Sequence, residues 1–265
     1  MRVFIEGVGL VGPGLRGWQA SRPLLAGSET YVHAPTIVTA SDLLPPAERR
    51  RISVPVKLAL ATGSEALRHA DRDAAATASV FTSSQGDGEN LHQICETLAS
   101  PERDISPTRF HNSVHNAPAG YWSIATRCMK TSTSLCGHDA SFAAGLLEAA
   151  VQVAVDGNPV VLIGYDQPYP EPLHTIRPIS ASFGVALAMT SQATRQAFAA
   201  LEISFGPRGE NATGMGDSSL EALRRGVPAA RSLPLLAVLA RNATETIVID
   251  CAAGNQLRIA VTPCC

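Results

Sequence analysis

The stretch TSTSLCGHDASFAAGLLEA, residues 131–149, decides the fold of this chain. Its first five residues, Thr131–Leu135, are β-favouring and predict a strand. From about Ala140 the pattern changes to a smooth amphipathic helix. Strand, sharp turn and helix is the arrangement on which many enzymes mount a nucleophile. Cys136 and Ser141 are therefore the two candidate nucleophiles of this stretch.

Strand-like and helical segments alternate on both sides of this stretch. Continuous apolar strands between helices are typical of α/β layering, in which helices cover both faces of a sheet. Loops with little structure are expected at 27–50, 100–116 and 166–178. Strands are predicted at 3–7, 78–84, 130–135, 159–164, 183–190 and 200–206, helices at 55–70, 89–99, 117–129, 140–155, 219–226 and 233–242, and a β-hairpin at 245–261.

Length and charge exclude several classes of protein. With 265 residues, of which 45% are hydrophobic, the chain can bury a sizeable core in one large domain or two small ones. The net charge is −2 and no long Lys/Arg run occurs, so nucleic acid and anionic membranes are not expected partners. No leader-like segment and no apolar run of roughly 18 residues is present, which predicts a soluble, cytoplasmic protein.

The six cysteines do not have the paired spacing of a zinc site. In a cytoplasmic chain they are expected to be thiols. Cys95 and Cys128 fall in helical patterns and are predicted to be small core residues. The terminal pair, Cys264 and Cys265, is interpreted as a frayed tail without a role.

Three histidines were considered as metal ligands. His111 and His115 are four residues apart, but they lie in a segment that is predicted to be a loop, so no helical face brings them together. His138 is adjacent to Asp139 in the sequence, which points the two side chains apart. We therefore predict no metal site and no cofactor.

Several segments together resemble one known family. ISPTRFHNSVHNAPAGYWSI (105–124) is similar to the loop and helix of β-ketoacyl synthases, which belong to the thiolase superfamily. RVFIEGVG (2–9) resembles their opening strand, and DGNPVVLIGYD (156–166) resembles the strand after their nucleophile helix. FGVALAMT (183–190) is similar to a further strand of the family. The resemblance is strongest to the short chain-length factors of aryl-polyene type.

This resemblance implies a thiolase-like fold of α-β-α-β-α layers. It implies a thiolase-like N-terminal half at 1–190, followed by a reduced C-terminal half at 191–265 that ends in the β-hairpin. It also implies a synthase-type dimer to which an acyl carrier protein delivers the acyl chain.

The chemistry of a condensing enzyme is missing. In the family a cysteine begins the helix, where the helix N-terminus lowers its thiol pKa. Counting along the chain from the flanking matches places that slot at Asp139 or Ala140, and neither is cysteine. Cys136 lies a turn too early and is expected to be structural. Ser141 lies just beyond the slot and is expected to be a capping residue.

The C-terminal half supports the same interpretation. The H-T-G-T and K-x-x-x-G-H strings that the family carries there do not occur, and no histidine follows residue 190. In the family these histidines stabilise the enolate or oxyanion, and the sequence shows no residues that would take their place. We therefore expect no condensing activity from the chain alone.

The function predicted from these observations is that of a non-catalytic chain-length factor. It would pair with a catalytic β-ketoacyl synthase in fatty acid, polyene or polyketide biosynthesis, as a heterodimer, with a homodimer possible when alone. Phe110 and Asn116 would line the partner's acyl tunnel. The pairing strand would consist of Thr131, Ser132, Thr133, Ser134 and Leu135.

Two alternatives stay open at this point. The chain is an acyltransferase or thioester hydrolase if Ser141 or Cys136 finds a base within about 3 Å. It is an acyl-binding scaffold if it forms a stable homodimer without a synthase.

Overall fold

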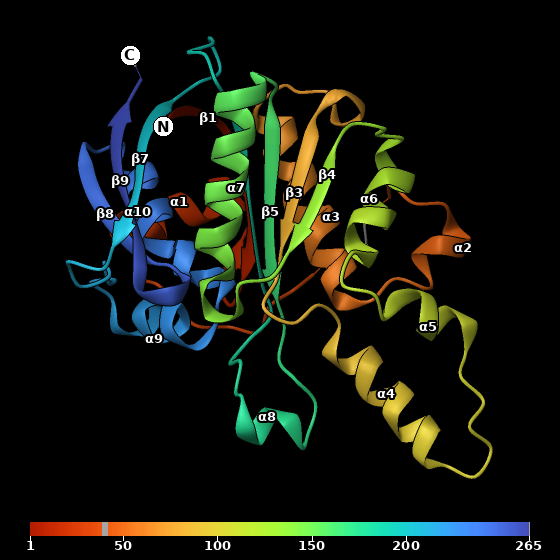
Figure 1. Cartoon of the computed structure of the whole chain (residues 1–265). Helices are drawn as coiled ribbons and strands as arrows, with labels where there is room; N and C mark the ends of the chain where they lie inside the picture. Colours follow the sequence, from red (N-terminus) through yellow and green to blue (C-terminus); the bar gives the residue numbers. More distant parts are fainter. Residues whose placement is uncertain (39–41, 265) are drawn as a thin grey trace.

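A computed structural model describes residues 1–38 and 42–264 of the chain, and their strands form a single twisted sheet (Figure 1). The strands are β1 (Arg2–Gly12), β2 (Leu15–Arg16), β3 (Ala78–Thr82), β4 (Ser132–Leu135), β5 (Val160–Asp166), β6 (Phe183–Thr190), β7 (Ala199–Pro207), β8 (Glu245–Asp250) and β9 (Asn255–Pro263). Their order in the sheet is β4-β3-β5-β6-β1-β7-β9-β8, with β2 paired to β1. All the strands predicted from the sequence are present.

The helices are α1 (Trp18–Ala26), α2 (Pro46–Arg49), α3 (Val54–His69), α4 (Gly88–Ala99), α5 (Pro107–Asn112), α6 (Ala117–Thr126), α7 (Ser141–Asp156), α8 (Leu173–Ile176), α9 (Ser218–Gly226) and α10 (Leu233–Arg241). The six predicted helices, α3, α4, α6, α7, α9 and α10, are all confirmed. The predicted loops were wrong in part, because each of them contains a short helix: α2, α5 or α8. The helix α1 was not predicted; it carries Pro23 in its interior, a residue that argues against helix.

The strand β1 joins the two halves of the chain. Residues Phe4–Val11 pair with β6 of the N-terminal half, while Arg2–Ile5 pair with β7 of the C-terminal half. The strands β3, β4 and β5 are parallel, and the other pairings are antiparallel. A division of the chain near residue 190 therefore stays a prediction, since hydrogen bonds of one strand connect both parts.

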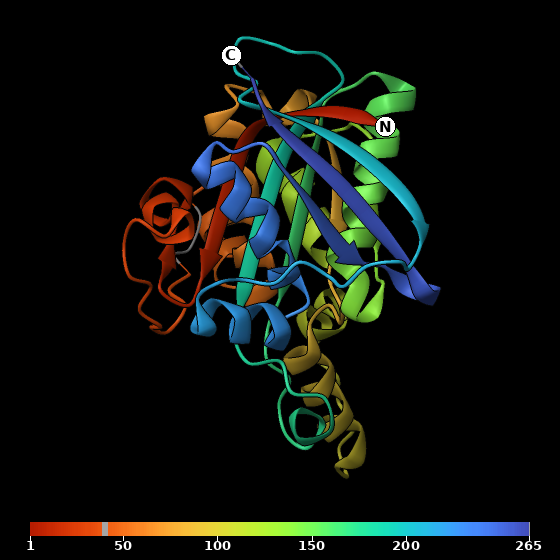
Figure 2. The same ribbon diagram turned by 90° about the vertical axis from the view of Figure 1, so that its left-hand side faces the viewer.

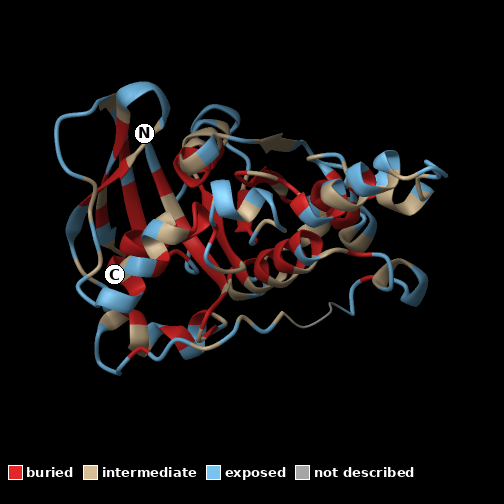
Figure 3. Ribbon diagram, turned by 90° about the horizontal axis from the view of Figure 1, so that it is seen from below, coloured by how far each residue is buried: buried red, intermediate tan, exposed pale blue. Residues whose placement is uncertain are grey.

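Helices cover both faces of the N-terminal strands, as expected from the apolar strands. One apolar cluster packs α3 and α6 against one face, and a second cluster packs α7, α10 and α1 against the other. Figure 1 shows α7 in front of β5, with α3 on the opposite side. Buried residues concentrate in the strands and in the helices that face them, and exposed residues lie at the periphery (Figure 3).

Of the strands in the described part of the chain, the C-terminal half contributes β7, β9 and β8, which cross obliquely beside α10 (Figure 2). Residues Leu233–Ala240 of α10 are all buried, which is typical of a helix between two layers. On β9, Leu257, Ile259 and Val261 are buried on the side of α10, whereas Arg258 and Thr262 on the opposite face are exposed. The face of β9 that carries Arg258 and Thr262 is therefore open to solvent.

The cysteine predictions had mixed outcomes. Cys128 is buried, and its Sγ donates a hydrogen bond to the Thr77 carbonyl oxygen (3.3 Å). Cys95 is exposed on α4, so its placement in the core was wrong. The amide of Cys264 donates to the carbonyl of Phe198 (3.0 Å), and Cys265 lies outside the described residues.

The closest approach in the core is that of α3 to β1, and it requires glycine. A Cβ on Gly9 would lie 1.9 Å from the carbonyl oxygen of Thr62, and one on Gly7 would lie 2.0 Å from that of Ala66. Both oxygens belong to the backbone of α3, which cannot turn away as a side chain can. The two glycines thus fix how closely α3 packs on the sheet.

We predict that Gly9→Ala lowers the free energy of unfolding by about 3 kcal/mol or more, because the added methyl group forces α3 away from β1. Urea unfolding measures the change. The matched control is Gly206→Ala on β7, where a Cβ meets nothing within 4 Å, and its effect is expected to stay within about 0.5 kcal/mol. Equal stability of the two variants would contradict the close packing of α3 on β1.

Candidate functional site

The candidate site lies where the parallel strands β3, β4 and β5 end. Because their carboxyl ends meet at one edge of the sheet, the segments that follow them lie together. These segments are 83–88 after β3, 136–140 after β4 and 167–169 after β5. A second set of groups reaches the same place from Arg177 and from the short 3₁₀ helix Ala229–Ser232.

A strained turn connects β4 to α7. His138 has a φ of +53°, in the left-handed region that a non-glycine residue rarely adopts. A 3₁₀ turn at His138–Ala140 then leads into α7, which begins at Ser141. The predicted strand, sharp turn and helix are therefore present, and the strained residue is His138 rather than Cys136 or Ser141.

Ser141 is closed off from any substrate. Ser141 is buried, with 1% of its surface exposed. Its Oγ donates a hydrogen bond to the carbonyl oxygen of His138 (2.7 Å) and accepts one from the amide of Gly137 (3.0 Å). Both bonds hold the turn together. The hydroxyl thus stabilises the turn, and it donates its proton to a backbone carbonyl and not to a general base.

Cys136 is exposed and directly follows β4. Its Sγ donates to the carbonyl oxygen of Ser84 (3.4 Å). The thiol therefore precedes the 3₁₀ turn and does not occupy the first turn of α7, where a helix N-terminus would stabilise a thiolate.

Asp139 is the side chain that fills the turn ahead of α7. Its Oδ1 lies 2.9 Å from Nη2 of Arg177, and its Oδ2 lies 3.2 Å from Nη2 of Arg231. Burial by itself would raise the pKa of this carboxyl, but the charge of Arg231 and the hydrogen bond from Arg177 lower it below its ordinary value. Asp139 is therefore held as a carboxylate, which is not a nucleophile of the thiolate kind. Ala140, the other residue to which the slot was assigned, is buried.

Asp166 is a functional candidate that the sequence analysis missed. It is 1% exposed at the end of β5. Its Oδ1 accepts hydrogen bonds from the amide (2.8 Å) and the hydroxyl (2.7 Å) of Ser84, and its Oδ2 accepts one from the amide of Ala229 (2.8 Å). This carboxyl thus links the end of β3 in the N-terminal half to a 3₁₀ helix of the C-terminal half. Burial raises its pKa to about 6, although these hydrogen bonds oppose the shift.

The histidines considered as ligands lie in different surroundings. The ring of His111 packs edge-on against Tyr121, with ring centroids 5.9 Å apart. Nε2 of His115 is 3.4 Å from the carbonyl oxygen of Ser83, and His138 faces Arg177 at 2.6 Å. Within residues 1–38 and 42–264, no group of three or more His, Cys, Asp or Glu side chains is arranged to hold a metal ion.

Phe110 and Asn116 lie at the outer side of this region. Phe110 is on α5 and is 66% exposed, so it does not pack in the core of its own subunit. Asn116 precedes α6 and lines a groove of about 540 Å³ beside β4, together with His115, Ala119, Gly120, Ser123, Ser132 and Ser134. In Figure 1, α4, α5 and α6 all lie on the side of the sheet where β4 forms the edge.

None of the helices in the described part of the chain combines the length and apolarity needed to cross a membrane.

Comparison with known proteins places these features in context. Residues 18–252 match the family described as beta-ketoacyl synthase, N-terminal domain. No curated protein matches the chain. Among solved structures, the chain is similar to one from the ketosynthase ApeO in complex with its chain length factor ApeC from Xenorhabdus doucetiae, with 23% identity and a TM-score of 0.75 over 98% of this chain and 99% of that one.

Two further structures have the same fold. The ishigamide ketosynthase/chain length factor matches with 15% identity and a TM-score of 0.74, over 99% of both chains. A type II PKS acyl-carrier protein in complex with its ketosynthase, AntDE:AntF, matches with 12% identity and a TM-score of 0.72, over 99% of both chains. These similarities confirm the thiolase-like fold that the sequence motifs predict.

We predict that Asp166 makes the chain less stable as the pH rises from about 4.5 to 6. The folded chain holds the Asp166 proton up to about pH 6, whereas the unfolded chain releases it near pH 4, so ionisation favours unfolding in this window. The Asp166 contribution falls by about 1.4 kcal/mol per pH unit at most. The hydrogen bond from Arg224 lowers the pKa of Glu221 to about 2. Glu221 therefore makes the chain less stable as the pH falls below about 4.5, which is the opposite dependence.

Urea unfolding at several pH values tests this. Asp166→Asn is expected to flatten the slope between pH 4.5 and 6 and to lower stability overall, since an amide cannot accept all the bonds from Ser84 and Ala229. Asp156→Asn, on the exposed end of α7, should keep the slope of the unmodified chain. A slope that survives in Asp166→Asn would show that another group causes it.

Proposed function

Because the chain belongs to the β-ketoacyl synthase N-terminal domain family, we propose that it is a non-catalytic, chain-length-factor subunit. It pairs with a catalytic β-ketoacyl synthase, and an acyl carrier protein delivers the growing chain to that partner. The chain itself shapes the end of the partner's acyl tunnel.

The observation that carries this proposal is the state of the turn between β4 and α7. Asp139, one of the two residues at which counting along the chain expects the family's nucleophile, is held as a carboxylate by Arg177 and Arg231. A condensing enzyme needs a thiolate there to accept the acyl group. The hydroxyl of Ser141 accepts a hydrogen bond from the amide of Gly137 and donates one to the carbonyl of His138, which argues against Ser141 as the nucleophile of a hydrolase.

The free edge of β4 supports pairing. The carbonyl of Thr131 accepts from Ser79, and that of Leu135 accepts from Ser83, so odd-numbered residues direct their backbone groups toward β3. In a parallel ladder the residues between them direct their amide and carbonyl groups the other way. Ser132 and Ser134 therefore present unpaired backbone groups at the sheet edge. An antiparallel strand of a partner would satisfy them and continue the sheet.

The surroundings of this edge are suited to contact with another protein. Exposed apolar side chains lie on the segments beside β4: Ile124 on α6, Met129 in the following loop, and Val151 and Val155 on α7. Gly120 on α6 leaves open space in the groove beside the strand. Apolar groups that flank an unpaired edge are characteristic of an interface. The similar structure from Xenorhabdus doucetiae is a ketosynthase in complex with its chain length factor, which is the assembly proposed here.

The exposure of Phe110 supports the tunnel role. Its ring belongs to α5, which is held to α4 by a hydrogen bond from Nδ2 of Asn90 to the carbonyl of Arg109. Phe110 is 66% exposed, and its ring is therefore available for contact with a partner. At the partner's tunnel it would occupy volume that an acyl chain otherwise fills.

We predict that Ser134→Pro dissociates the complex with the catalytic synthase. Proline removes the Ser134 amide, which faces the free edge, while the bonds from Thr133 and Leu135 to β3 remain. Association should weaken at least about tenfold in size-exclusion chromatography or a binding titration.

Ser134→Ala is the matched control, since it keeps the amide and should bind normally. The melting temperature of the isolated Ser134→Pro chain should stay near that of the unmodified chain. A Ser134→Pro complex that elutes unchanged would mean that β4 is not the pairing strand.

We also predict that Phe110→Ala lengthens the product of the co-expressed pair. Each additional pair of buried methylene groups gains about 1.6 kcal/mol, which shifts a product ratio by about an order of magnitude. Mass spectrometry of the products measures chain length. Because Phe110 is exposed, the melting temperature of the isolated chain should barely change.

Phe205→Ala is the control for this variant, since Phe205 is 52% exposed on β7, away from α5. It should leave the product length as it is. If Phe110→Ala changes only the amount of product and not its length, the ring does not limit the chain.

A further inference from the structure

A cleft of about 480 Å³ opens in the C-terminal half, away from the edge of β4. One wall is the segment Arg208–Thr213 after β7, and the floor is Val248–Asp250 of β8. The opposite wall is formed by the end of α9 and the 3₁₀ helix Ala229–Ser232. Its volume is within the range of sites that hold small molecules.

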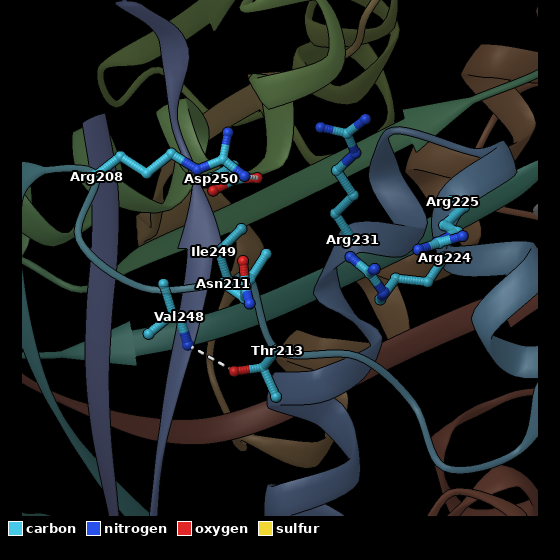
Figure 4. A pocket seen from close by; sticks show the side chains of 10 residues that line it. Arg208, Asn211, Thr213, Arg224, Arg225, Arg231, Val248, Ile249 and Asp250 are labelled. Atoms are coloured by element: carbon cyan, nitrogen blue, oxygen red, sulfur yellow. Dashed lines mark hydrogen bonds and ion pairs between the residues drawn. The ribbon is translucent and has the colours of Figure 1, made fainter. Parts of the chain in front are cut away.

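Four of the ten residues that line this cleft are arginines. Figure 4 shows that Arg208 enters from the loop, whereas Arg224, Arg225 and Arg231 enter from the helical wall. Asp250 is the single acidic lining residue. The chain as a whole has a net charge of −2, so this concentration of positive charge is local. Like charges repel, and gathering them at one cleft is unfavourable unless an anion compensates.

The carboxylates near the four arginines do not balance them. Glu221 serves two guanidinium groups, with 2.7 Å to Arg224 and 3.0 Å to Arg225. Asp250 is 3.4 Å from Arg208.

The third carboxylate, that of Asp139, also contacts an arginine outside the cleft. Asp139 lies 3.2 Å from Arg231 and 2.9 Å from Arg177, which does not line the cleft. In the described part of the chain, the four arginines of the cleft therefore meet three carboxylates, one of which is shared with Arg177, so the cleft keeps an excess of between one and two positive charges.

We propose that this cleft binds a phosphate monoester. Such a group carries a charge of about −1.5 to −2 at pH 7, which matches the excess, and it offers three acceptor oxygens. Guanidinium groups bind phosphate oxygens in pairs, and those of Arg225 and Arg208 are accessible to a ligand, since their side chains are 76% and 58% exposed and each has donors beyond its one ion pair. Ala212, Val248 and Ile249 supply an apolar surface for the organic part of the ester.

The cleft is coupled to the slot ahead of α7 through Arg231. Its guanidinium lines the cleft and also contacts the carboxylate of Asp139. A bound phosphate would compete with Asp139 for this arginine, so a ligand of the C-terminal half can loosen the turn in the N-terminal half. The proposal goes beyond the pairing function and does not depend on it.

Isothermal titration of the intact chain tests the proposal with glycerol 3-phosphate, inorganic phosphate and acetate at matched ionic strength. We expect saturable binding of the ester at one site, and no comparable binding of acetate. Arg208→Gln/Arg225→Gln should weaken it at least about tenfold. The control Arg195→Gln/Arg241→Gln removes two exposed arginines outside the cleft and should leave the affinity unchanged.

The other outcomes each overturn the assignment. Absence of saturable binding excludes an anion site, and equal losses in the two double variants show unspecific attraction. Acetate binding as tightly as the ester excludes selectivity for a dianion. Binding of inorganic phosphate without the ester excludes an organic ligand. Unfolding curves of both variants ensure that lost binding is not lost structure.

Discussion

The carboxylate of Asp139, held between two arginines, is the interaction on which this account depends. Arg177 comes from the segment after β5 and Arg231 from the C-terminal half, so one anion joins three distant parts of the chain at the start of α7. In a condensing enzyme that place must stay open for a thioester and must hold a nucleophile. Here Asp139 and the two arginines lock the turn. The ion pairs are shielded only in part from water, and their main effect is to fix geometry rather than to add much stability.

The proposed pairing surface and the C-terminal half lie in separate parts of the structure. The edge strand β4, the groove beside it and the helices α5 and α6 all belong to the N-terminal half, whose strands are covered by helices on both faces. The C-terminal half adds the strands β7, β8 and β9 and the helices α9 and α10, and Arg258 and Thr262 on the outer face of β9 are exposed. Asp166 connects the two halves from a fully buried position, through Ser84 and Ala229. The C-terminal half therefore does not contribute to the edge at which a partner would bind.

Sequence patterns were sufficient for elements with a clear period. The strands and the long helices followed from apolar spacing, and the motifs around residues 105–124 indicated the thiolase-like fold. The short helix α5 was missed because its six residues have no apolar period and depend on a contact with α4.

The site was predictable only in part for a similar reason. Counting along the chain found Asp139, but its partners Arg177 and Arg231 are distant in sequence, and only the folded chain brings them together. Asp166 was visible as the end of a buried strand, yet nothing in the sequence indicated that its carboxyl is buried. The same holds for the arginine cleft, whose four members come from three segments of the C-terminal half.

The most direct test of the central claim is intact-mass spectrometry of the complex with a catalytic synthase after incubation with an acyl thioester. The account predicts an acyl adduct on the synthase alone and none on this chain, with or without the partner. An adduct on this chain that disappears in Cys136→Ala or Ser141→Ala would contradict the account, because it would show that a nucleophile still operates beside Asp139.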